Sequence, residues 1–194
     1  MEILFFIIGY ALLSDAILTF QVYLTLFVKN VFDFSDKLVT YTGVTGLVFG
    51  IIGGFMANKF AVRLNSKERA LGFSALLYAF CFALFALVPN VPFLVFIVMA
   101  ICGLSYGLVF SLARAVFSEI SPKEEQAEFF SIYTVFERAA SILGPLLWIL
   151  TFFLLKKFGE GIQYRGAVLF LMIICLVGYY YLRKSKNTSE VLVS

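Results

Sequence analysis

Histidine is absent from this sequence, and charge is scarce in it. Charged residues make up 14% of the 194 positions, against about 25% in an ordinary soluble domain. Without histidine the chain lacks the usual metal ligand and the usual general base, which excludes a Ser–His hydrolase. The three cysteines, Cys81, Cys102 and Cys175, each lie inside an apolar run without metal-type spacing, so we expect buried structural thiols. The sequence therefore predicts no metal site, no cofactor and no enzyme.

Two further absences narrow the function. No G-x-x-x-x-G-K-[ST] motif is present, so any energy-driven step would use an ion gradient rather than ATP. The formal net charge of +3 is too small to favour a nucleic-acid partner.

The sequence is rich in long hydrophobic segments. Hydrophobic residues make up 62% of the chain, 24 residues are phenylalanine, and the mean hydropathy is +0.98. A helix needs about 20 apolar residues to cross a bilayer, and six segments qualify: 3–28, 40–58, 70–88, 92–113, 128–155 and 165–182. We predict an all-α, multi-pass integral membrane protein with a lipid bilayer as its solvent. Residues 1–184 form one six-helix domain in this interpretation, and 185–194 form a polar tail.

The basic residues of the loops predict the orientation, because cytoplasmic loops carry an excess of Lys and Arg. With the N-terminus inside, nine basic residues fall on the cytoplasmic side: Lys59, Arg63, Lys67, Arg69, Arg114, Lys123, Arg183, Lys184 and Lys186. Five fall on the other side: Lys29, Lys37, Lys156, Lys157 and Arg165. We therefore expect both termini to be cytoplasmic, in a membrane that the sequence does not specify.

Polar and small residues separate inner from outer helices. Segment 3–28 carries Asp15 and Gln21 within lipid depth, while 70–88 and 165–182 have almost no interior polar residue and are predicted to face lipid. Glycines at helical spacing, which let backbones approach closely, mark 40–58 and 92–113: Gly46, Gly50, Gly53, Gly103 and Gly107. The inner helices are thus the first, second, fourth and fifth, a period of three that is typical of a bundle built from three-helix repeats.

Charges inside apolar runs define the candidate site, because such charges are costly in lipid and face protein or a water-filled cavity. Asp15 is predicted either to bind a proton or solute, or to make a structural hydrogen bond. Arg138 is expected to neutralise Asp15 or an anionic substrate. Glu137 points about 100° away from Arg138 on a helix and is expected to meet Arg114. The alternative for these residues is a static charge cluster near the cytoplasmic end.

Two stretches are interpreted as signals for a helix start and a helix kink. Ser121-Pro122 has the pattern of a helix start, with serine as the cap and proline at the first helical position. Gly144-Pro145 is predicted to kink the fifth helix, since proline interrupts the backbone hydrogen bonds.

The helix order resembles one half of a major facilitator superfamily transporter. In that fold the first and fourth helices of each half line the cavity, the second and fifth meet the other half, and the third and sixth face lipid. A second resemblance lies between the second and third segments, where GFMANKFAVR is similar to the superfamily's cytoplasmic G-x-L-A-D-R-x-G-x-R loop. Gly54, Lys59 and Arg63 keep the character of that loop, while Asn58 replaces its Asp.

A more specific resemblance covers residues 111–147. SLARAVFSEISPKEEQAEFFSIYTVFERAASILGPLL is similar to the LSRSLFARLIPKGREAEFFGLY…GKASSFLGPL block of the autophagy-related vacuolar effluxer-like family. The resemblance implies that this chain corresponds to helices seven to twelve of a twelve-helix secondary transporter for a small solute such as an amino acid.

Half of a transporter needs a partner. We expect a second six-helix half or a homodimer, joined through the glycine face of 40–58 and the Gly144-Pro145 face of 128–155. The alternative for the glycine stripe of 40–58 is packing within this bundle. The alternative function is a non-transporting membrane module, or a gene fragment, that assembles with another transporter half.

Overall fold

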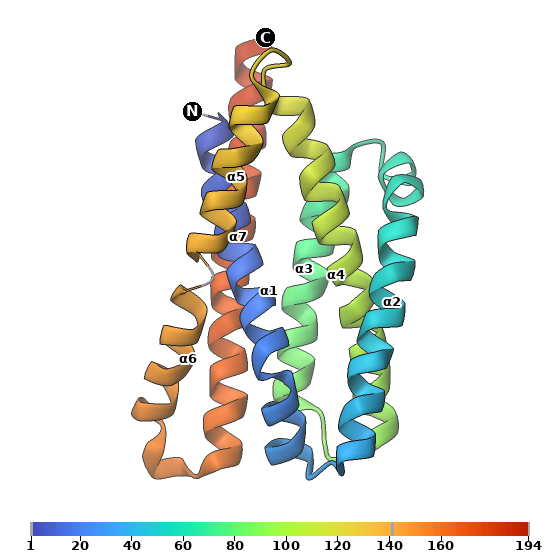
Figure 1. Cartoon of the computed structure of the whole chain (residues 1–194), viewed down its shortest axis with the longest axis vertical. Coiled ribbons are helices and arrows are strands. Elements are labelled where there is room, and N and C mark those ends of the chain that lie inside the picture. The colour runs from blue at the N-terminus through green and yellow to red at the C-terminus, as the bar shows by residue number, and fades with distance from the viewer. Residues whose placement is uncertain (1, 141, 194) are drawn as a thin grey trace.

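The computed structural model describes residues 2–140 and 142–193, with side chains described for 3–139 and 142–185. Long apolar runs with few interior prolines favour helix throughout, and the helices are joined by short connections (Figure 1). Their bounds are α1 (Glu2–Phe32), α2 (Asp36–Arg63), α3 (Lys67–Leu87), α4 (Pro92–Ile120), α5 (Gln126–Ala140), α6 (Leu143–Leu154), η1 (Lys156–Phe158) and α7 (Glu160–Val193).

Six spans in the described part of the chain are long and apolar enough to cross a membrane, with α5 and α6 together forming the fifth. The predicted all-α, six-helix fold is therefore confirmed. The helices run several residues past the predicted bounds, because helical structure continues into polar residues where the apolar pattern stops. At the end of α7, the backbone remains helical through 185–193, and the division into a domain of 1–184 and a tail stays a prediction.

The bundle is built on two close helix pairs. α1 packs along α7, and α2 packs along α4, while α3 contacts both α4 and α7 and joins the pairs (Figure 1). α5 lies against α1, and α6 lies against α7. α1 begins and α7 ends at the same end of the bundle (Figure 1).

Aromatic packing connects α1 to α3. The ring of Phe20 lies 5.2 Å from that of Phe82 and 5.1 Å from that of Phe85, measured between centroids. Phe27 continues the cluster at 5.9 Å from Phe85. Such pairs stabilise a core beyond the area that they bury, and they fix α1 at the centre of the fold.

Backbone contact joins α2 to α4, and only glycine permits it. A Cβ atom added to Gly103 would overlap the carbonyl oxygen of Gly46, and one added to Gly107 would overlap that of Gly50. At Gly53 a Cβ would overlap the carbonyl of Leu104. The expectation that this glycine face meets a second half is therefore wrong, because the small residues are used inside the bundle.

α3 is more buried than predicted. Its interior-facing side includes Ser74, Tyr78 and Cys81, all buried, and Ser74 accepts a hydrogen bond at its carbonyl oxygen from the Ser105 hydroxyl at 2.7 Å. The sequence pattern missed this because small and aromatic residues in α3 fill the space between α4 and α7. Only the opposite side of α3, with Phe73 and Phe80, is exposed.

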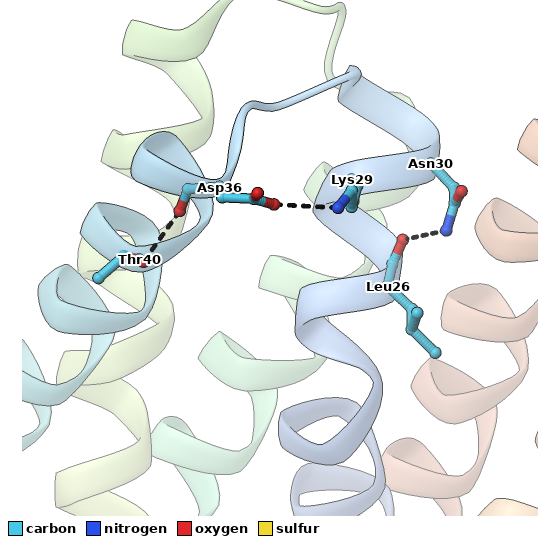
Figure 2. Close-up of polar contacts among 5 residues, drawn as sticks. All are labelled: Leu26, Lys29, Asn30, Asp36 and Thr40. Carbon is cyan, nitrogen blue, oxygen red and sulfur yellow. Dashed lines mark hydrogen bonds and ion pairs between the residues drawn. The ribbon is translucent and has the colours of Figure 1, made fainter.

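The connections have local causes. Asp33 and Asn65 take left-handed backbone angles with φ of 53°, which Asn and Asp adopt more readily than most residues. Between α1 and α2, Lys29 Nζ lies 2.9 Å from Asp36 Oδ1 (Figure 2). In the same view Asn30 donates to the Leu26 carbonyl at 2.8 Å.

Two sequence expectations about connections need correction. The residues of the supposed loop motif, Gly54, Asn58, Lys59 and Arg63, all lie within α2, which ends at Arg63. Ser121 does not begin a helix. It ends α4, where its hydroxyl donates back to the Phe117 carbonyl at 2.7 Å. A serine does cap a helix start at Ser66, whose hydroxyl accepts from the Arg69 N–H at 3.2 Å at the beginning of α3.

Candidate functional site

The fifth span is broken rather than kinked. α5 ends at Ala140 and α6 begins at Leu143, so Gly144 and Pro145 fall in the first turn of α6 (Figure 1). Proline belongs in a first helical turn, because the N–H that it lacks has no partner there. The sequence predicted a kink at Gly144-Pro145 inside one helix. In the structure one helix ends and the next begins just before that pair.

Asp15 of α1 caps the broken end. Ile142 precedes α6 and has no polar side chain to accept from the first N–H groups. The Asp15 Oδ1 atom accepts from the Gly144 N–H at 2.9 Å, which is the bond that a capping residue normally provides from its own chain segment. A carboxylate is also favoured by the partial positive charge at a helix N-terminus. The start of α6 is therefore held by another helix.

The surroundings of Asp15 are closed and incompletely satisfied. Asp15 and Thr19 are both buried, and neither Asp15 Oδ2 nor Thr19 Oγ1 has a hydrogen-bond partner among the described residues. A Cβ atom added to Gly144 would overlap Thr19 Oγ1 and reach Asp15 Oδ1 at 3.0 Å. Glycine at 144 is thus required by close contact with α1.

A charged hollow of about 620 Å³ lies between α1, α4 and α5. Its wall combines two guanidinium groups and one carboxylate with a phenol, a hydroxyl and apolar groups: Leu18, Arg114, Phe130, Tyr133, Thr134, Glu137 and Arg138. Glu137 is half-buried, while Arg114 and Arg138 are exposed. The hollow therefore presents both signs of charge within one space.

Stacked tyrosines form one side of this hollow. The ring of Tyr133 lies 4.5 Å from that of Tyr10 and 4.7 Å from that of Phe117. Both phenol hydroxyls are buried and lack a hydrogen-bond partner within the described residues. Tyr133 therefore lines the hollow, and Tyr10 stacks against it from α1.

The structure divides the residues that the sequence grouped together. Arg114, Glu137 and Arg138 share the charged hollow, although no Arg114–Glu137 ion pair within 4.0 Å is formed in the described part of the chain. The predicted Asp15–Arg138 pair is wrong, since the Asp15 carboxylate bonds to Gly144 instead. Gln21 lines a separate hollow of about 580 Å³ with glycines of α2 and α4.

Sequence reasoning missed Tyr10 as a neighbour of the charges. Tyr10 lies on α1, distant in sequence from α5, and a single tyrosine within an apolar run gives no signal. Tyr133 stands four residues before Glu137, a spacing that places both on one helix face.

The six spans have a fold of a known class, that of one half of a facilitator-type bundle. The inward-open structure of the xylose transporter XylE of E. coli superposes with a TM-score of 0.74 at 16% identity, covering 94% of this chain and 46% of XylE. The structure of an auto-inhibited POT family peptide transporter gives 0.70 at 17% identity, over 94% of this chain and 37% of that one. At these identities the likeness shows the fold.

Within that class, the chain belongs to the vacuole effluxer Atg22-like family, whose model matches residues 1–184. The resemblance drawn from 111–147 is thereby confirmed. Among curated relatives, autophagy-related protein 22 of Vanderwaltozyma polyspora is 27% identical over 93% of this chain and 36% of its own length. Autophagy-related protein 22-1 of Aspergillus fumigatus is 30% identical over 89% of this chain and 30% of its own length.

The chain thus spans about a third of the length of these curated relatives. The matched family is described as an effluxer and the structural neighbours as transporters, in agreement with the prediction that the chain is not an enzyme.

Proposed function

We propose that this chain is the six-helix C-terminal half of an effluxer that moves a small zwitterionic solute, such as an amino acid, by alternating access. In this mechanism two six-helix halves rock about a central site, and the solute is exposed to one side of the membrane at a time. The second half is a further six-helix bundle, either a different one or a second copy of this one.

The charged hollow is the observation that carries this proposal. An amino acid has an ammonium and a carboxylate group, and the hollow offers Glu137 for the first and two arginines, Arg114 and Arg138, for the second. Arginine binds carboxylates through two parallel hydrogen bonds, which gives both energy and orientation. Tyr133 lines the same hollow, and its ring stacks on that of Tyr10.

Two exposed apolar faces support a second half. Only 22% of the most apolar window of α2 and 19% of that of the α5–α6 span are buried, against 67% for α1. The outer side of α2 presents Val44, Leu47, Ile51 and Phe55. Because α2 and α5 are the helices that meet the other half in the facilitator fold, these faces are where we place the partner. These faces replace the glycine stripe of α2 as the proposed contact surface for the second half, because that stripe packs against α4.

Transport is tested by reconstitution in liposomes. The chain is inserted alone or together with a second polypeptide, and counterflow of labelled leucine is measured. The second polypeptide is the part of the Saccharomyces cerevisiae relative that lies outside its match to this chain. That match covers 38% of the relative. Glu137→Gln removes the carboxylate that would hold the ammonium group and should lower counterflow about 10- to 100-fold. Glu160→Gln, at an exposed position at the start of α7, is the matched control and should leave it unchanged.

The outcomes separate the alternatives. Counterflow by the chain alone indicates a homodimer, and counterflow only with the added half indicates a heteromeric transporter. No counterflow in either preparation favours the non-transporting module, and equal rates for the two glutamate variants would overturn the assignment of the hollow.

We also propose that both ends of the chain are cytoplasmic, supported by the excess of basic residues at that end of the bundle. A cysteine at Lys123 should then be shielded from an impermeant thiol reagent in intact cells while one at Ser35 reacts. The reverse labelling would invert the topology.

A further inference from the structure

A second feature with arginines in its wall lies between α3 and α7. A groove of about 390 Å³ opens where α3 begins and the apolar part of α7 ends. In Figure 1 these segments lie at the end of the bundle where α1 begins and α7 ends. Its wall includes Arg69, Gly72, Phe73 and Leu76 of α3 and Tyr179 and Arg183 of α7. The solute pathway proposed above does not use these residues.

The polar part of this groove suits an anion. The guanidinium groups of Arg69 and Arg183 are exposed and form no ion pair with any described residue. Glu68 also lines the groove, so its lining carries one net positive charge. Arginine is the side chain best suited to phosphate, because its planar fork of N–H groups matches phosphate oxygens. Two unpaired arginines at one mouth therefore indicate a phosphate ligand.

The apolar part continues from the mouth toward the middle of the membrane. Phe73, Leu76 and Phe80 follow each other on one face of α3 and are 52%, 39% and 57% exposed. Gly72 leaves room for the Tyr179 ring, which a Cβ atom would approach to 3.2 Å. Tyrosine is enriched at membrane–water interfaces, where its ring is apolar and its hydroxyl is wet. A ligand that fills this groove has an anionic head and a long apolar tail.

We propose that the α3–α7 groove binds an anionic phospholipid of the leaflet at the termini. The phosphate is held between Arg69 and Arg183, and an acyl chain lies along Phe73, Leu76 and Phe80. Basic pockets between transmembrane helices near a membrane surface are known to select such lipids. The lipid would brace α3 against α7 at the edge of the bundle that is farthest from the proposed partner half.

Lipid retention measured by native mass spectrometry tests the site. Delipidated chain is mixed with phosphatidylglycerol or phosphatidylcholine of identical acyl chains, and the bound fraction is compared. The wild type should retain phosphatidylglycerol in preference to phosphatidylcholine. Arg69→Gln and Arg183→Gln should each weaken phosphatidylglycerol about fivefold, and the double variant about 30-fold. Lys156→Gln/Lys157→Gln, which removes two exposed charges at the other end of the bundle, should match the wild type.

Soluble glycerol phosphate separates a lipid site from a general anion site, because it offers the same head without the tail. It should not displace the lipid. Equal retention of the two lipids, equal loss in the lysine control, or displacement by glycerol phosphate would each overturn the proposal. Circular dichroism checks the fold of each variant, and the single variants decide the question if the double variant does not fold.

Discussion

Removing the Asp15 carboxylate should detach the start of α6 from α1. In Asp15→Ala the Gly144 N–H loses its acceptor, and Ile142 offers no replacement. In Asp15→Asn the amide oxygen can still accept from the Gly144 N–H. The two variants therefore separate the hydrogen-bond acceptor from the charge.

The expected sizes follow from the burial of this bond. A buried donor left without a partner costs about 1–3 kcal/mol, which is also the scale of losing a helix cap. At about 2–4 °C per kcal/mol for a chain of this length, Asp15→Ala should melt roughly 3–10 °C below the wild type. Asp15→Asn should stay within about 0.5 kcal/mol, because it keeps the acceptor and removes a buried charge that has a single hydrogen bond.

The chain contains a reporter at the right place. Its one tryptophan, Trp148, lies in α6 and stacks on Tyr23 of α1 with ring centroids 4.6 Å apart and planes 4° apart. Fluorescence of Trp148 should therefore report the separation of α6 from α1, while circular dichroism at 222 nm reports the whole helical bundle. In Asp15→Ala the fluorescence transition should move to lower temperature and precede the loss of helix.

Three results would refute this reasoning. Equal melting of wild type and Asp15→Ala would show that the cap contributes nothing. Equal destabilisation of the alanine and asparagine variants would show that the charge matters rather than the acceptor. Coincident fluorescence and dichroism transitions in Asp15→Ala would show that α6 does not separate locally.

Two other predictions use matched positions. Gly107→Ala should destabilise the bundle by about 1–3 kcal/mol, since its Cβ would overlap the Gly50 carbonyl. Gly43→Ala, with nothing within 4 Å of its Cβ, should stabilise α2 by up to about 1 kcal/mol. Thermal melting in detergent compares the two variants, and equal shifts in melting temperature would contradict the packing. Arg165→Leu should cost about 1.5–3 kcal/mol, because its guanidinium donates to the carbonyls of Ala86 and Val88 at 2.5 and 3.1 Å. Lys29→Leu, which loses only an exposed pair with Asp36 (Figure 2), should cost at most about 1 kcal/mol, and a larger loss for the lysine in the same melting assay would reverse this ranking.

The membrane fold could be predicted because its signals are local. Six apolar runs of sufficient length fix the number of spans, and the glycine spacing in 40–58 and 92–113 correctly indicated close helix contact. The spacing of the glycines could not identify the helix that they contact, since small residues are needed for close packing against either a helix of the same bundle or a second half. The backbone contacts of Gly103 and Gly107 with α2 decide between them.

The candidate site was harder to predict, because its contacts join distant parts of the chain. Asp15 and Gly144 are 129 residues apart. Charge pattern alone paired Asp15 with Arg138, whereas the structure pairs it with a backbone N–H. The broken helix supplies that N–H, and a kink would have left it bonded within the helix. Placing the break just before Gly144-Pro145 was therefore the step needed to find the partner of Asp15.

The distribution of packing indicates where this half-bundle can move. α2 and α4 are locked by backbone contact at successive glycines, and α1 and α3 are locked by the Phe20, Phe82 and Phe85 rings. The α5–α6 span has the least buried apolar window of the six. Among the described residues at its break, the Gly144 N–H donates a charge-assisted hydrogen bond to Asp15. Segments with few buried contacts open at the lowest free energy. Because Glu137 and Arg138 lie on α5, rearrangement at this break would change the charged hollow while leaving the two locked pairs intact.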